Sequence, residues 1–266
     1  MELWLRLSPL LGCMAAGLGL LFWSQWRSAR KEQREHVEAL TALAARLGGT
    51  MVSDPEKATA WSAELLRPFK NYTGGFINWL ATVRRPRFEI ALDFVRGPWR
   101  LRVTEVSMER RGSTGGVTHH EHRIEVITAP LPPVKLARRL YTDFLGRPLK
   151  PGHVLSEGTA VISEPPVTVA RQQGEWQRLR LPGHYDSQYA VFANDLGAAN
   201  RMLNRDVLEY LVENASVLPF VLTFEDGFFY ATMPYRIGPN TLPKTLEAVL
   251  GLLERVPGAA PTHAQR

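Results

Sequence analysis

The stretch FEIALDFVRGPWRLRV, residues 88–103, predicts the kind of sheet that this chain forms. Hydrophobic and polar residues alternate over residues 88–95 and again over residues 99–103. A period of two is typical of strands with one buried face. Gly97 and Pro98 stand between the two runs and predict a turn that reverses the chain. We therefore expect the two runs to pair as antiparallel strands.

The elements on either side of this pair predict the fold class. Further strands are expected over residues 124–127, 159–163, 167–170, 175–181 and 189–193, and helices over residues 28–47, 134–145, 196–211 and 242–256. The dipeptide Asp226-Gly227 separates two apolar runs and predicts a hairpin, because a type I′ turn needs positive φ at both central residues. Strands that follow one another in runs indicate an α+β fold, with helices packed on a mainly antiparallel sheet.

The N-terminal segment has the composition of a membrane span. The twenty residues from Leu7 to Trp26 carry no charge. A helix of this length, at about 1.5 Å per residue, matches the bilayer core of about 30 Å. We therefore expect a transmembrane anchor over residues 1–26, formed by Leu7, Leu10, Leu18, Leu20, Leu21, Phe22, Trp23 and Trp26. A cleaved signal peptide and a lipoprotein signal at Cys13 are the alternatives.

Basic residues follow this segment directly and predict its orientation. They are Arg27, Arg30, Lys31 and Arg34. Since Lys and Arg concentrate on the cytoplasmic side of a span, the rest of the chain is expected in the cytoplasm. Residues 27–48 should form a juxtamembrane helix. Its apolar spacing over 28–47 favours packing on the chain's own domain, and the alternative is a homodimer through the same residues.

The remainder is expected to form a soluble α+β domain over residues 49–257, followed by a disordered tail over 258–266. Two subdomains that meet near residues 150–185 are an alternative. Of the 266 residues, 45% are hydrophobic and 22% charged, which is typical of a globular protein. The net charge of +6 comes from scattered Arg residues, so we expect no nucleic-acid partner.

One cluster could bind a metal ion. His120 and His122 lie two residues apart, so on a strand they point to the same face. Imidazoles are ligands of zinc and nickel, but a catalytic site needs a third ligand and an open position. The alternative is a pair of solvated side chains near the glycine-rich turn of residues 112–116. The sequence holds no HExxH, GxSxG, phosphate-loop or dinucleotide-binding motif, and we expect no catalytic residue and no cofactor.

An aromatic group flanks the predicted hairpin turn. It comprises Phe224, Phe228, Phe229 and Tyr230. Packing in the core or across strands is the first interpretation of this group, and an interaction surface for a partner is the second.

The C-terminal third resembles bacterial single-pass membrane-anchored proteins of unknown function. The residues that carry the resemblance are Tyr189–Asp195 (YAVFAND), Met202–Leu208 (MLNRDVL) and the Asp226-Gly227 hairpin. The resemblance implies an intact anchor and no particular activity.

The sequence thus predicts a membrane-tethered, non-enzymatic interaction or accessory domain. Its expected partners are the lipid bilayer and a protein, and its expected location is the cell membrane with the domain in the cytoplasm. One alternative is a membrane-anchored, metal-dependent hydrolase that uses His120 and His122. The other is a small-ligand-sensing domain with a pocket at the aromatic group.

Overall fold

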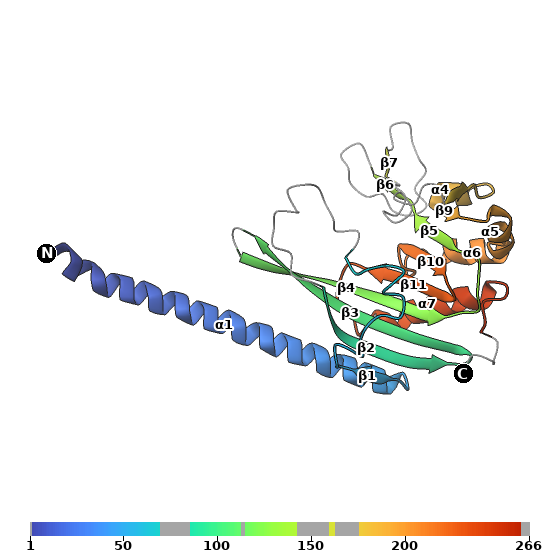
Figure 1. Cartoon of the computed structure of the whole chain (residues 1–266). Coiled ribbons are helices and arrows are strands. Elements are labelled where there is room, and N and C mark those ends of the chain that lie inside the picture. The colour runs from blue at the N-terminus through green and yellow to red at the C-terminus, as the bar shows by residue number, and fades with distance from the viewer. Residues whose placement is uncertain (1, 70–85, 113–114, 143–159, 163–175, 262–266) are drawn as a thin grey trace.

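The computed structural model describes residues 2–69, 86–112, 115–142, 160–162 and 176–261. Within the first helix, the side chains of residues 2–19, 21, 22, 25 and 29 lie outside this description. The architecture is a large antiparallel sheet with helices on one face and an extended N-terminal helix (Figure 1).

The described residues form a nine-stranded sheet in which every neighbouring pair is antiparallel. In spatial order its strands are β1 (Thr50–Val52), β2 (Arg87–Arg96), β3 (Trp99–Gly112), β4 (Gly115–Ile127), β11 (Phe228–Met233), β10 (Val221–Glu225), β5 (Val134–Arg138), β9 (Tyr189–Ala193) and β8 (Gln177–Leu179). The short strands β6 (Leu140–Thr142) and β7 (Ala160–Ile162) pair separately. The predicted reversal at Gly97-Pro98 joins β2 to β3.

The two faces of the sheet differ in chemistry because side chains alternate along each strand. On β3 and β4, the cross-strand pairs Leu101–Val126 and Val103–Ile124 lie on one face, while Arg102–Glu125 lies on the other. The apolar face holds the main core. The opposite face contains buried charged side chains, among them Arg123 and Glu125.

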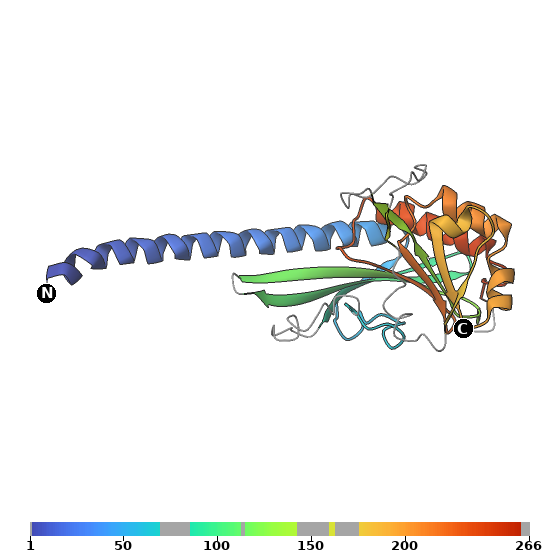
Figure 2. The ribbon, with the colours of Figure 1, turned by 90° about the horizontal axis from the view of Figure 1, so that it is seen from above.

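Helices cover the apolar face (Figure 2). They are the C-terminal part of α1 (Glu2–Arg46), α5 (Leu196–Met202), α6 (Arg205–Glu213) and α7 (Leu242–Arg255), and the single turn α4 (Tyr185–Gln188) precedes β9. The side-chain oxygens of Asp195 and Asn204 cap α5 and α6 by accepting from the third following N–H groups. Asn204 also marks the break inside the helical region predicted over 196–211.

Helix α1 packs on its own sheet through the face that sequence spacing suggested. Leu40, Leu43 and Ala44 are buried in the main core, and Val37 and Leu47 pack against it. Burial of this face against the chain's own domain supports the first interpretation of residues 28–47 over a dimer stem.

The expected fold class, a transmembrane helix followed by an α+β domain, is wrong. Among the residues that the structure describes with their side chains, no helix is long and apolar enough to cross a membrane. Residues 1–26 do not form a separate element, because one helix runs from Glu2 to Arg46. Its described part becomes charged from Arg27 onward, and the side chains of Leu7, Leu10, Leu18, Leu21 and Phe22 lie outside the described residues.

Two smaller expectations also need correction, and two others fall wholly or mostly outside the described residues. The helix expected over 134–145 is strand β5, whose residues 134–137 are buried on both faces, so that its pattern is continuous and not alternating. The disordered tail expected over 258–266 is wrong for its first residues, because Ala259 is buried and its carbonyl accepts from the Ala129 N–H at 2.9 Å, while residues 262–266 lie outside the described residues. The strand expected over 167–170 lies outside the described residues. Most of the subdomain boundary expected near residues 150–185 also lies outside the described residues. Strands β5, β9 and β8, which come before and after this region, belong to one sheet.

The Asp226-Gly227 hairpin is confirmed. Both residues have positive φ, 51° and 77°, and β10 pairs with β11 directly on either side. We predict that Gly227→Ala lowers the free energy of unfolding by about 1 kcal/mol, because a Cβ disfavours this conformation. Urea denaturation followed by circular dichroism measures the change. Gly197→Ala, inside α5 and without positive φ, is the matched control, and an equal loss there would contradict the backbone argument.

Candidate functional site

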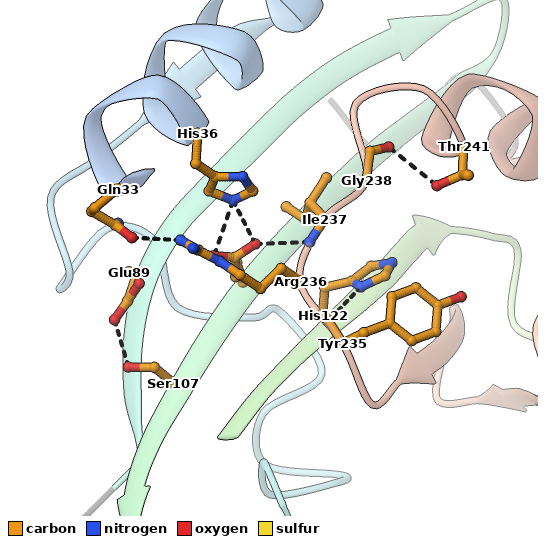
Figure 3. Close-up of polar contacts among 11 residues, drawn as sticks. Gln33, His36, Glu89, Ser107, His122, Tyr235, Arg236, Ile237, Gly238 and Thr241 are labelled. Atoms are coloured by element: carbon orange, nitrogen blue, oxygen red, sulfur yellow. Dashed lines mark hydrogen bonds and ion pairs between the residues drawn. The ribbon is translucent and has the colours of Figure 1, made fainter. Parts of the chain in front are cut away.

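The candidate site is a buried polar cluster between α1 and the sheet, centred on Glu105 of β3 (Figure 3). The Glu105 side chain has an exposed fraction of 0%. Glu105 lies on the same sheet face as the apolar core, because it is two residues along β3 from Val103. It pairs with His122 of β4. A carboxylate at this position loses its hydration and needs partners from the protein.

Three groups from distant parts of the sequence supply those partners. His36 Nε2 lies 3.0 and 3.2 Å from the two carboxylate oxygens. Arg236 Nε donates to one oxygen at 3.2 Å, and the Ile237 N–H donates to the other at 2.8 Å. Because a carboxylate only accepts, Nε2 of His36 carries a proton. Arg236 also donates from Nη2 to Gln33 Oε1 at 2.5 Å, which adds a second link to α1.

These contacts set the ionisation of Glu105. Burial alone raises the pKa of its carboxyl group, but the His36 hydrogen bond, the Ile237 N–H and the charges of His36 and Arg236 together lower the pKa to about 2. Glu105 is therefore a carboxylate at neutral pH. It connects α1 to the segment between β11 and α7.

The structure places the two histidines predicted to bind a metal on the same face of β4, but in different contacts. His122 is buried, its Nδ1 lies 2.7 Å from the Tyr235 carbonyl oxygen, and its ring packs edge-on against Tyr235 with the centroids 5.0 Å apart. Nδ1 therefore donates to the carbonyl. Burial lowers the pKa of His122. The hydrogen bond to Tyr235 and the charge of Glu105 raise this pKa, but by less.

His120 belongs to a different group of potential ligands. Its ring, the carboxyl of Glu89 and the carboxyl of Glu105 each offer an atom within 4.8 Å of the others. Glu89 sits at a bulge of β2 and accepts from Ser107 Oγ at 2.5 Å. Burial, followed by the charge of Arg236, lowers the pKa of His120.

This group is poorly suited to a cation. The carboxylate of Glu105 already accepts from His36, Arg236 and Ile237, and a divalent ion would have to compete with the Arg236 charge for the same oxygens. The predicted His120–His122 pair is not part of one ligand set among the described residues. The arrangement holds α1 and the segment before α7 on the sheet.

A second polar layer lies on the opposite face and was not predicted. Glu125 accepts from the Trp61 N–H at 2.9 Å and from the N–H and hydroxyl of Ser62 at 2.7 and 2.6 Å. Arg123 donates to the carbonyl and hydroxyl oxygens of Ser62 at 3.2 and 3.0 Å. Glu121 accepts from the Phe69 N–H at 3.0 Å. The segment over residues 54–69 is thereby fixed on this face. The sequence feature that could have indicated this layer is the charged residue at every second position of β4, at Glu121, Arg123 and Glu125.

The aromatic group of the hairpin lies mostly in the interior. Phe224, Phe229 and Tyr230 are buried, with the two Phe rings edge-on at 5.1 Å. The interpretation of these three residues as an exposed partner surface is therefore wrong. Only Phe228 of the four lines the open cleft of about 600 Å³ beside the hairpin, together with Leu65, Ile127 and Leu131.

The part of α1 before Gln33 extends away from the sheet as a helical arm, defined here as residues 20–32 (Figures 1 and 2). Its described side chains include Leu20, Trp23 and Trp26, with exposed fractions of 65%, 54% and 53%. The guanidinium groups of Arg27 and Arg30 lie over the rings of Trp23 and Trp26, at 5.3 and 3.8 Å from the ring centroids. The basic residues predicted to set topology therefore lie beside two predicted anchor residues on an exposed helix surface.

Comparisons with known proteins add little to this geometry. No protein-family model and no curated protein matches the chain. The structure is similar to the crystal structure of the mycobacterial trehalose monomycolate transport factor A, TtfA, with 13% sequence identity and a TM-score of 0.41. That alignment covers 84% of this chain and 96% of TtfA. A likeness of this degree supports no statement about function.

We predict that Glu105→Gln lowers the free energy of unfolding by about 3 kcal/mol, because it removes the negative charge held between His36 and Arg236. Chemical denaturation of the full chain measures the loss. Glu38→Gln, on the exposed side of α1, is the matched control and should change stability by less than about 0.5 kcal/mol. Equal effects of the two variants would contradict the role of Glu105.

The same carboxyl predicts a pH dependence. Its pKa is about 2 in the folded chain and near the ordinary value of 4.5 in the unfolded chain, so it stabilises the fold above pH 4.5. Its contribution, about 3 kcal/mol, is lost as pH falls from 4.5 towards 2. We expect the stability difference between the wild type and Glu105→Gln to shrink over that interval when unfolding is measured at each pH. A constant difference would show that the carboxyl does not titrate as described.

Proposed function

We propose that this chain is a non-enzymatic interaction or accessory domain that presents the α1 arm to a partner. The observation that carries the proposal is the Glu105 cluster. His36 and Gln33 belong to α1, and both are held to the sheet side through Glu105 and Arg236. Buried polar contacts of this kind fix the direction in which the arm leaves the body.

The chemistry of the cluster favours this role over catalysis. A general acid or base needs access to substrate and a proton that it can exchange near neutral pH. Glu105 has neither, since it is fully buried and its pKa is about 2. The metal-dependent hydrolase built on His120 and His122 gains no support, because His122 is engaged with Tyr235 and lies outside the His120 group.

The small-ligand hypothesis rests on the cleft beside the hairpin, and one charged side chain of its lining is already engaged. Glu225 is one of the lining residues of the cleft at the hairpin. Its carboxylate accepts from the Tyr230 hydroxyl at 2.6 Å and lies 3.8 Å from Lys135 Nζ. The interaction domain is therefore the function that we favour.

The proposal includes a location. The concentration of Arg27, Arg30, Lys31 and Arg34 at the base of the arm supports a position at the cell membrane, with the body on the cytoplasmic side, because anionic lipids of that leaflet attract basic segments. This location remains a prediction.

Photocrosslinking of the full chain in the cells that express it tests the proposal. A photoreactive residue is placed at Ser24 or Ser28, both exposed on the arm, and at Asp206, exposed on α6, as the matched control. We expect adducts, with protein or lipid, from the arm positions and few from Asp206. Adducts from Asp206 alone, or from none of the three positions, would contradict the proposal.

A further inference from the structure

The arm and the first residues of α1 after it carry two parallel rows of side chains, and in each row one indole is followed by two cations. One row is Trp23, Arg27 and Lys31, and the other is Trp26, Arg30 and Arg34, each spaced by four residues. Residues four apart are neighbours on a helix surface, so each row runs along the axis from an indole to two cations. An open hollow of about 430 Å³ lies against these six side chains.

The rows are exposed and their cations are only partly balanced. Lys31 Nζ lies 3.7 Å from the Glu35 carboxylate, and both side chains are largely exposed. The guanidinium groups of Arg27 and Arg30 lie over indole rings. A stacked guanidinium keeps its charge and its outward N–H groups for an anion. The rows therefore present positive charge beside exposed aromatic surface.

Phospholipid headgroups match this combination. Guanidinium groups bind phosphate through two parallel hydrogen bonds, and tryptophan is enriched at the headgroup level of bilayers because its ring is apolar and its N–H is polar. Exposed indoles beside cations suit a bilayer surface, where charged headgroups adjoin apolar chains. A folded acidic protein would offer carboxylates but would not require indoles on one side of the cations.

We infer that the two rows bind the anionic headgroups of a phospholipid bilayer. The inference rests on the proposed function, since it names the partner of the arm. The binding takes place at the bilayer surface and uses the six side chains of the two rows.

Vesicle flotation of the full chain tests the inference. Partition coefficients are measured on phosphatidylcholine vesicles and on vesicles that also contain phosphatidylglycerol, and the ratio of the two isolates the response to anionic lipid. We expect a ratio well above one for the wild type. Arg27→Gln combined with Arg30→Gln and Arg34→Gln should lower the ratio by about tenfold or more, since each basic residue near such a surface contributes to binding.

The matched control removes the same charge elsewhere. Arg180→Gln, Arg201→Gln and Arg205→Gln together neutralise three exposed arginines of the body, and this variant should keep most of the ratio. A wild-type ratio of one, or equal losses in the two triple variants, would overturn the inference. If the ratio is one while Ser24 and Ser28 crosslink only to protein, the lipid inference fails and the proposed function stands.

Discussion

The structure depends on one buried negative charge, the carboxylate of Glu105. A carboxylate removed from water is tolerated only where nearby groups donate hydrogen bonds and opposite charge. Those groups come from α1 and from the segment before α7, at His36, Arg236 and Ile237. Because the Glu105 carboxylate of β3 needs these hydrogen bonds and charges, it fixes where α1, a helix of 45 residues, contacts the sheet. The apolar contacts of Leu40 and its neighbours then stabilise that arrangement.

On the opposite face of the sheet, a buried carboxylate likewise binds a segment outside the sheet, here the segment over residues 54–69. Glu125 is buried among the backbone N–H groups of Trp61 and Ser62, and Arg123 binds the same serine. Irregular backbone has N–H groups that no ladder satisfies, and a buried carboxylate satisfies several of them at once. Buried acidic residues therefore attach non-sheet segments to both faces.

Local patterns in the sequence predicted much of the sheet but little of the site. Alternation over residues 88–103 and the Asp226-Gly227 turn gave strand pairs that the structure contains, because both signals are local. The apolar run from Leu7 to Trp26 suggested a separate span, whereas the backbone forms one continuous helix with the charged residues that follow. The Glu105 cluster joins residues separated by 69 and 131 positions, and no spacing rule relates His36 or Arg236 to β3. The sequence pointed to His120 and His122 because they lie two residues apart on one strand, whereas His36 is the histidine that contacts the central carboxylate.

The central claim is that Glu105 holds the C-terminal part of α1 on the sheet and leaves the arm exposed. Hydrogen–deuterium exchange of the full chain, resolved along α1 in the wild type and in Glu105→Gln, tests it most directly. The account predicts that amides around His36 are strongly protected in the wild type and exchange faster in the variant, while amides of β4 and β11 keep most of their protection. Unchanged protection around His36 in a folded variant would contradict the account, because α1 would then be held by its apolar contacts alone.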